Sequence, residues 1–282
     1  MSRILLIFHE GDREQGSREP GAGYLVSRLI PLWARAKHHI YVAFGPGNLP
    51  EADLAFMHVD LSVRPEAYEE MLGRYPLVVN GAVRDVRKRT ISRLLVGPGD
   101  DWDGPVIAKS DLNFAGIPEA LQRQAVAASG SGPRRREEPD ALPYAIFESL
   151  RAVPEEGFAD PRYVIERFLS EREGERYCVR TWTFLGDRER CTRYMSPEPI
   201  VKAGNVVARE PAEVPDDLRA ERERLGFDYG KFDFVLNEGM ALLFDANPTP
   251  GVPPRMPEIE AGNAALARGI DLFVERAAAL AR

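Results

Sequence analysis

Residues 231–251 read KFDFVLNEGMALLFDANPTPG, and the fold and the site are predicted from this stretch outward. Two apolar runs flank Asn-Glu-Gly, a sequence that favours a β-hairpin turn. In such a hairpin Asp233 lies on one strand, while Asp245 and Asn247 share a face of the other. Asn247 before Pro248 is by itself typical of a strand end. Two carboxylates and an amide oxygen together indicate a Mg²⁺ site that also holds substrate phosphates.

This hairpin sequence resembles the metal-binding hairpin of ATP-grasp enzymes, the superfamily that contains D-alanine–D-alanine ligases and ribosomal-protein glutamate ligases. The resemblance implies that Asp233, Asp245 and Asn247 hold two magnesium ions, replaceable by manganese, which bridge the phosphates of ATP. It also implies that Lys231, two positions before the first aspartate, contacts the reacting groups.

Two lysines upstream match phosphate-binding positions of the same family. PVIAK at 105–109 resembles the family's strand that ends in a phosphate-contacting lysine, here Lys109. Lys88 lies in a predicted linking helix, 87–96, where the family has a first ATP-contacting lysine. A lone lysine on a helix is equally consistent with a solvated charge. An ammonium group beside the phosphates stabilises charge during phosphoryl transfer.

The segment VIERFL resembles the family's hinge between the two lobes that clasp ATP. The match implies that the Glu166 side chain meets the adenine amino group. It also implies that Arg167, Phe168 and Leu169 contribute main-chain contacts. On spacing alone the segment is equally consistent with a strand end that carries an exposed glutamate.

Four more polar residues follow in the family's order. YCVR resembles the strand whose arginine faces the phosphates, so Arg180 is expected to be catalytic together with Arg193 and Lys231. Lys202 and Asn205 then fall where the family has further phosphate-side or substrate-side groups.

The match departs from the family pattern after Lys109. The family has a glycine-rich loop that covers the phosphates, whereas residues 110–116 contain a single glycine. Residues 129–143 show no apolar periodicity and predict a mobile surface loop. This loop is either a replacement lid or a solvated charge run, and it carries Arg134, Arg135 and Arg136.

The first 86 residues alternate between strand and helix patterns, which predicts a small, largely parallel sheet covered by helices. The predicted strands are 4–8, 40–44, 55–58 and 77–79, and the predicted helices are 24–36 and 64–72. Ligands collect at the carboxyl ends of such strands. The polar residues at these ends are His9, His58, Asp60 and Asn80, and the candidates for substrate choice are Glu10, Arg18, His58 and Asp60.

The whole pattern predicts an α/β protein of the α+β kind, organised as the ATP-grasp fold. Its expected parts are an N-terminal α/β domain (1–86), a linking helix with a small ATP-binding lobe (87–185), and a C-terminal lobe with the hairpin (186–282). Further strands are predicted at 105–109, 144–150, 163–168, 177–185, 232–236 and 241–244, and a helix at 261–282.

Composition restricts the classes of function. The 282 residues carry a net charge of −7, which argues against a nucleic-acid surface. No apolar stretch approaches bilayer length, and the N-terminal apolar run is too short for a signal peptide, so a cytoplasmic location is expected. Cys178 and Cys191 lack metal-binding spacing.

The expected activity is ATP-dependent joining of a carboxylate to an amine through an acyl phosphate, with release of ADP and phosphate. The substrates would be small molecules or peptides, and a homodimer is expected because related ligases are often dimers. Two alternatives stay open, a kinase of the same fold and a non-catalytic ATP-binding protein. A kinase would form ADP without an added amine, and a binding protein would never turn ATP over.

Overall fold

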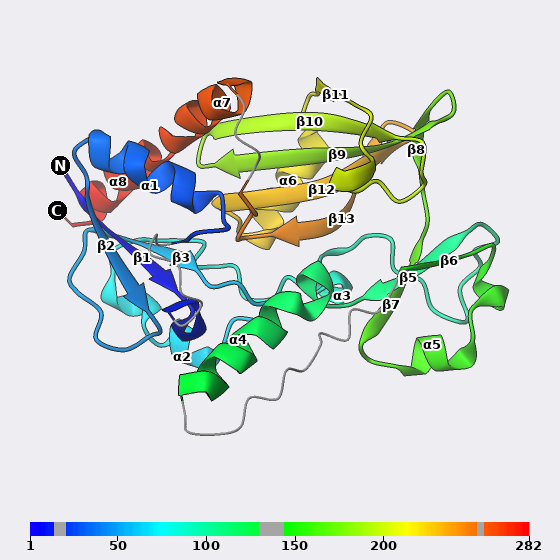
Figure 1. Ribbon diagram of the computed structural model, residues 1–282, viewed down its shortest axis with the longest axis horizontal. Coiled ribbons are helices and arrows are strands. Elements are labelled where there is room, and N and C mark those ends of the chain that lie inside the picture. Colours follow the sequence, from blue (N-terminus) through cyan, green and yellow to red (C-terminus); the bar gives the residue numbers. More distant parts are fainter. Residues whose placement is uncertain (14–20, 130–143, 253–256, 282) are drawn as a thin grey trace.

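The computed structural model describes residues 1–13, 21–129, 144–252 and 257–281 (Figure 1). Its N-terminal sheet is parallel, in the order β2-β1-β3-β4, with β1 (Arg3–Phe8), β2 (His39–Phe44), β3 (Leu54–His58) and β4 (Val78–Val79). β1 is a continuous apolar run because both of its faces are buried. The small parallel sheet predicted from the sequence is confirmed.

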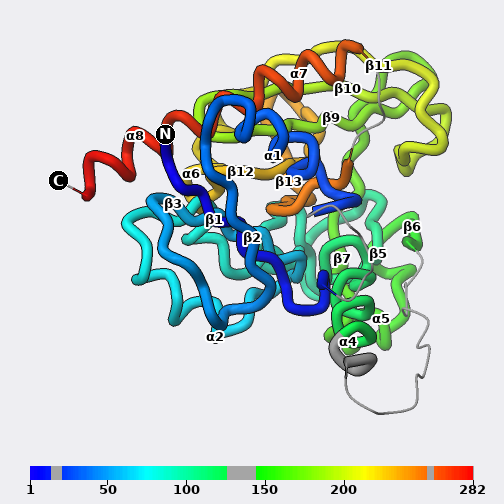
Figure 2. The backbone as a smooth tube through the Cα atoms, turned by 60° about the vertical axis from the view of Figure 1, so that its left-hand side comes forward, coloured from blue at the N-terminus to red at the C-terminus, as the bar shows by residue number. Residues whose placement is uncertain are grey.

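Helices cover both faces of this sheet. α1 (Val26–Arg35) packs on one face, together with α7 (Pro257–Ala267) and α8 (Ile270–Leu280) from the C-terminal end of the chain. The short α2 (Glu66–Glu69) and η2 (Leu72–Arg74) lie on the opposite face, and η1 (Glu10–Arg13) follows β1. Figure 2 shows the C-terminal helices beside α1, so the two ends of the chain share one core.

The small lobe is built on an antiparallel sheet in the order β6-β5-β7. Its strands are β5 (Val106–Ser110), β6 (Ala145–Phe147) and β7 (Tyr163–Arg167). The other elements of this part are α3 (Lys88–Ile91), η3 (Asn113–Gly116), α4 (Ile117–Ser129), η4 (Leu150–Ala152) and α5 (Glu155–Ala159).

The large lobe is an antiparallel sheet in the order β11-β10-β9-β12-β13, with β8 beside β9. Its strands are β8 (Glu171–Glu173), β9 (Arg176–Leu185), β10 (Arg188–Ser196), β11 (Ala208–Pro211), β12 (Tyr229–Asn237) and β13 (Met240–Asn247). α6 (Asp216–Leu225) covers one face over Trp182, Phe184 and Phe232, and η5 (Ala203–Asn205) lies between β10 and β11. The predicted hairpin is β12 and β13.

Several predicted elements differ from the structure. The linking helix expected at 87–96 is the single turn α3, and Leu95 forms a β-bridge with Glu166. The helix expected at 64–72 is reduced to α2, followed by the turn η2. The helix expected at 261–282 is two helices, α7 and α8. The two helices are separated at Gly269, where a Cβ would lie 1.9 Å from the Leu185 carbonyl oxygen, so only glycine fits this contact.

Several other elements were not predicted at all, namely the helices α4, α5 and α6 and the strands β8, β10 and β11. The expected boundary between residues 185 and 186 falls in the turn between β9 and β10, two paired strands of one sheet. The predicted loop beyond Ser129 and the substrate candidate Arg18 lie outside the described residues. No helix in the described ranges is both long and apolar enough to cross a membrane.

Candidate functional site

Two rows of polar side chains cross the face of the large sheet that lies opposite α6. Directly opposed residues of antiparallel strands point to the same face, so the register defines each row. The first, which we name the Asp row, consists of Thr192, Thr181, Asp233 and Asp245. The second, the Lys row, consists of Arg190, Thr183, Lys231 and Asn247.

The two aspartates of the Asp row are already paired with donors. Asp233 accepts a hydrogen bond from Thr181 Oγ1 at 2.7 Å and lies 2.8 Å from Lys231 Nζ. Lys88 Nζ lies 2.8 Å from Asp245 Oδ1. Burial acts to raise the pKa of Asp245, but attraction by Lys88, Lys231 and Lys109 outweighs burial and lowers it. Asp245 is therefore a carboxylate surrounded by three ammonium groups.

Lys231 is held in its charged form by the same aspartates. Burial acts to lower the pKa of Lys231, whereas Asp233 and Asp245 raise it, and the pKa reaches about 12. This ammonium group lies beside both carboxylates in the sheet, and it is the basic residue that the sequence places two positions before Asp233.

The other two lysines reach the hairpin from the small lobe. Lys88, at the start of α3, is only 4% exposed, and Lys109, in β5, is 5% exposed. Lys109 Nζ lies 2.7 Å from Glu166 Oε2 and donates to the Phe244 carbonyl at 3.1 Å. Burial lowers the pKa of Lys109, and Glu166 opposes that shift. The lysines therefore connect the two lobes at β13.

A β-bulge explains how Phe244 comes to face Lys109. Asp233 pairs with Asp245 but Phe234 pairs with Leu243, which leaves Phe244 as the extra residue of β13. A bulge bends its strand and turns side chains to new directions. The Phe244 ring centre consequently lies 5.1 Å from Lys109 Nζ, a cation–π distance.

Glu166 offers an unused acceptor next to Lys109. It is 1% exposed, and its Oε1 has no hydrogen-bond partner among the described residues. An acceptor of this kind fits the amino group of adenine. The N–H groups of Arg167 and Phe168 already donate to the Leu94 and Pro105 carbonyls. The main-chain contacts expected from Arg167, Phe168 and Leu169 stay predictions.

Two predicted catalytic arginines lie elsewhere in the sheet. Arg180 alternates with Trp182 and pairs with Arg193, so both arginines lie on the α6 face, opposite the Asp row. Arg180 contacts Glu171 twice at 2.9 Å, and Arg193 contacts the same carboxylate at 2.7 Å. The geometry brings neither arginine to the aspartates, and their expected roles stay untested predictions.

Lys202 and Asn205 lie in the loop between β10 and β11. Asn205 Oδ1 accepts from the Lys202 N–H at 2.7 Å, which shapes this loop. Lys202 Nζ lies 5.3 Å from the centre of the Tyr144 ring. The pKa of Tyr144 is raised, chiefly by burial. The charges of Lys88, which lowers this pKa, and of Asp245, which raises it, also act on the phenol, so it lies near the Asp row.

Sequence reasoning missed Tyr144 and Thr181. Tyr144 carries no motif signal because it precedes a strand of only three residues. Thr181 could have been found, since it alternates with Thr183 in RTWTF and therefore lies on the polar face of β9.

A hydrogen-bonded chain joins the N-terminal domain to the hairpin. Asn247 Oδ1 accepts from the Thr249 N–H at 2.7 Å and lies 3.0 Å from the Thr249 hydroxyl. That hydroxyl donates to Asp60 Oδ1 at 2.5 Å, and the Tyr24 hydroxyl donates to Asp60 Oδ2 at 2.8 Å. Burial raises the pKa of Asp60 to about 6, although both hydrogen bonds lower it.

The other polar residues at the strand ends are held by packing or by hydrogen bonds, and neither ring nitrogen of His58 has a hydrogen-bond partner among the described residues. His58 is completely buried among Phe8, Tyr24 and Tyr229, and burial lowers its pKa to about 3. His9 Nδ1 accepts from the Gly11 N–H, Glu10 accepts from the Tyr68 hydroxyl, and Asn80 holds the start of β12 through Tyr229.

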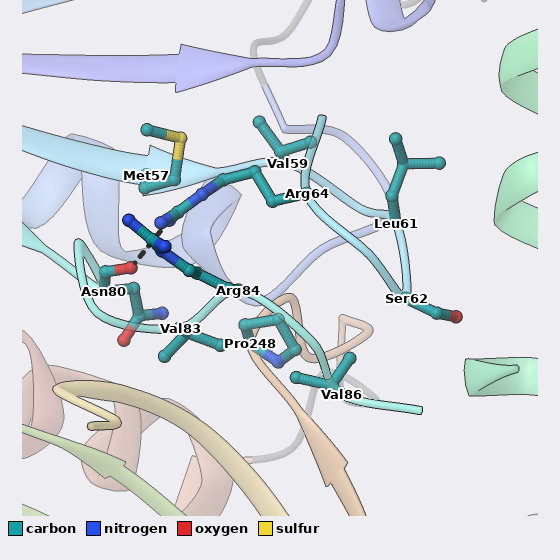
Figure 3. A pocket seen from close by; sticks show the side chains of 10 residues that line it. All are labelled: Met57, Val59, Leu61, Ser62, Arg64, Asn80, Val83, Arg84, Val86 and Pro248. Atoms are coloured by element: carbon teal, nitrogen blue, oxygen red, sulfur yellow. Dashed lines mark hydrogen bonds between the residues drawn. The ribbon is translucent and has the colours of Figure 1, made fainter. Parts of the chain in front are cut away.

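A small cavity lies between these strand ends and Pro248, which follows β13 (Figure 3). Its volume of about 20 Å³ leaves room for roughly one water molecule. Arg64, which lines it, donates to the Asn80 and Gly81 carbonyls at 2.9 Å and 2.6 Å. This cavity is part of the packing between the N-terminal domain and the hairpin.

The Asp row fits a magnesium ion in part. Asp233 and Asp245 are opposed, and Mg²⁺ commonly takes one or two carboxylates together with substrate phosphates. Asn247 fits less well because its Oδ1 already accepts from the Thr249 N–H. The part of the chain that the structure describes contains no cluster of three or more His, Cys, Asp or Glu side chains suited to a metal.

No family model matches the sequence, and no curated protein is similar to it in sequence. Solved structures do match the fold. A D-alanine–D-alanine ligase from Bacillus anthracis aligns over 98% of this chain and 97% of its own, with 12% identity and a TM-score of 0.51. The macrocyclase MdnC from Microcystis aeruginosa, bound with the precursor peptide MdnA, aligns over 95% and 99%, with 10% identity and a TM-score of 0.50.

Proposed function

We propose that this chain, which has the ATP-grasp fold, is an ATP-dependent ligase that joins a carboxylate to an amine. The observation that carries the proposal is the meeting of both lobes at Asp245. Lys88 from the small lobe contacts it, and Lys231 and Asp233 flank it on the neighbouring strand. Such a cluster suits a polyphosphate held between two lobes.

The reaction proceeds in two steps. A carboxylate is a poor electrophile, so its oxygen first takes the γ-phosphoryl group of ATP, which gives an acyl phosphate and ADP. The amine nitrogen then attacks the carbonyl carbon, and phosphate leaves with the electron pair of the broken C–O bond. The nitrogen loses one proton, which the departing phosphate can take, and the amide bond remains. A divalent ion held by Asp233 and Asp245 would neutralise and orient the phosphates.

The residues of the chain supply positive charge and shape. In the structure Lys88, Lys109 and Lys231 are paired with Asp245, Glu166 and Asp233. Phosphate oxygens would become additional partners of these ammonium groups beside the carboxylates. The three lysines would then stabilise the charge that develops on the transferred group.

The structural neighbours suggest which substrates to test first. One is a D-alanine–D-alanine ligase, and another was solved with a precursor peptide. Amino acids and peptides are therefore the first candidates for both the acid and the amine. Because the reaction consumes ATP, the cytoplasm is the expected location.

A coupled ADP-release assay tests the proposal, with Mg·ATP supplied against N-acetylated amino acids as acids and free amino acids as amines. We expect ADP and a new amide, identified by mass, when both kinds of substrate are present. ADP with a single acceptor and no amide would instead establish a kinase. ATP binding by calorimetry without any turnover would establish a binding protein.

A further inference from the structure

Arg190 differs from the other arginines on β10 and its neighbours. Arg180 and Arg193 each contact a carboxylate, as does Arg219, which pairs with Glu189. The Arg190 guanidinium instead donates from Nη1 to Asn263 Oδ1 of α7 at 2.9 Å. No carboxylate of the described residues forms an ion pair with it. Its positive charge is thus left without a counter-charge under α7.

The groups around Arg190 also lack partners. Asn263 is 1% exposed and its Nδ2 has no hydrogen-bond partner in the described ranges. Tyr229 is fully buried, and its hydroxyl also finds no partner there. Tyr229 and Arg190 interact electrostatically, and burial lowers the pKa of the guanidinium. Buried polar groups are normally hydrogen-bonded, so unmatched donors at one place indicate a missing acceptor.

Gly262 leaves space for the guanidinium. A Cβ at this position would lie 3.2 Å from Arg190 Nη1, closer than side chains normally pack. α7 therefore passes close to Arg190 at Gly262, and the next residue, Asn263, contacts the guanidinium. Guanidinium, amide N–H and hydroxyl are all donors, and together they suit the two oxygens of a carboxylate.

The Lys row places this group of donors beside the Asp row. Arg190, Thr183 and Lys231 lie opposite one another on three successive strands. Strands are about 4.8 Å apart, so roughly 10 Å separates the backbones of Arg190 and Lys231, and both long side chains can shorten that gap. A molecule bound to Arg190 by one end can therefore present its other end to Lys231 and the reacting groups.

We propose that Arg190, with Asn263 and Tyr229, binds a carboxylate of the amine substrate, which is an amino acid or a peptide with a free carboxyl group. This inference rests on the proposed ligase function and names one of its substrates. The carboxylate at Arg190 does not react. It orients the molecule so that the amine lies on the Lys231 side.

The experiment compares two sets of amines, free amino acids and the same amino acids as carboxamides. N-acetylated amino acids supply the reacting acid in both sets, and the amide product is measured by mass. We expect at least roughly tenfold more product from the free amino acids, because a charge-assisted hydrogen bond contributes about that factor or more. Equal products from both sets would overturn the inference and leave the ligase proposal standing, whereas no ADP with any pair would overturn both.

Variants locate the effect. Arg190→Gln should raise KM for the free amino acid roughly 10- to 100-fold and remove the preference over the carboxamide, with KM for ATP unchanged. Arg190→Lys should retain part of the preference. The matched control is Arg188→Gln, two residues earlier on β10, whose side chain is exposed and contacts only Asp187 at 3.4 Å among the described residues. If Arg190→Gln still preferred the free amino acid over the carboxamide, as the wild type is expected to do, the assignment of the carboxylate site to Arg190 would be contradicted.

Discussion

Replacement of Asp245 by asparagine tests the centre of the site. Asp245→Asn keeps the size and a hydrogen-bond acceptor but removes the negative charge 2.8 Å from Lys88 Nζ. Lys88 is 4% exposed, and its other side-chain hydrogen bond goes to the Leu112 carbonyl at 3.2 Å. The variant therefore leaves a buried ammonium group without a counter-charge.

The size of both effects follows from this geometry. Breaking a buried ion pair by removing one partner typically costs about 3–5 kcal/mol of unfolding free energy. We expect the lower end, about 3 kcal/mol, because Lys88 can release its proton in the variant. Turnover should fall roughly 10²- to 10³-fold, the usual effect of losing one preorganised electrostatic contact. The magnesium concentration for half-maximal turnover should rise as well.

Urea unfolding followed by tryptophan fluorescence measures the first effect, and ADP release across a magnesium titration measures the second. The control is Asp217→Asn, since the hydrogen bonds that Asp217 accepts among the described residues come from main-chain N–H groups, those of Leu218 at 2.9 Å and of Ala241 at 2.8 Å, at the end of β13 away from Asp245. The control should lose about 1 kcal/mol or less and keep full turnover. Normal turnover by Asp245→Asn would refute the metal assignment, and a loss below about 1 kcal/mol would refute the buried pair with Lys88.

Three further predictions concern other parts of the chain. Asp60 has a folded-state pKa of about 6 against 3.8 for the ordinary group, so the fold holds its proton longer than the unfolded chain does. The unfolding free energy of the wild type should therefore fall by about 2 kcal/mol relative to Asp60→Asn as the pH rises from 4 to 7. A constant difference across this window would contradict the raised pKa of Asp60. Gly269→Ala should lower the free energy of unfolding by about 3 kcal/mol or more in urea, because its Cβ would overlap the Leu185 carbonyl. The control Gly99→Ala, which has open space around it, should lower it by less than about 1 kcal/mol. Equal losses in the two variants would contradict the close contact at Gly269. Lys109→Met should weaken Mg·ATP binding at least roughly tenfold by calorimetry, and unchanged affinity would remove Lys109 from the nucleotide site.

Local patterns were enough to predict the elements with strong periodicity or a strong turn. β1, β2 and β3 are short apolar runs ending in polar residues, and the hairpin of β12 and β13 carries its own turn. The weaker patterns failed, because α6 has mostly charged residues and β10 is a mixture of charged and polar residues with few apolar ones. α6 is held to the sheet by one buried residue, Leu218, and β10 is a strand because it pairs with β9. Neither contact can be read from the local sequence pattern.

The sequence by itself placed Lys231 with Asp233 on one strand and Asp245 with Asn247 on the other, because residues two apart in a strand share a face. A hairpin without a bulge would pair Asp233 with Phe244 and put Asp245 on the opposite face, so the bulge at Phe244, which only the structure shows, brings the two aspartates together. The sequence also identified Lys88, Lys109 and Glu166 as candidates, and the structure brings the two lysines to the hairpin and Glu166 to Lys109. Only the tertiary structure decided which arginines lie on that face. A shift of one residue in strand register moves a side chain to the opposite face, and the register of β9 and β10 with the hairpin depends on packing between distant segments. That register places Arg180 and Arg193 opposite the Asp row and Arg190 in line with Lys231.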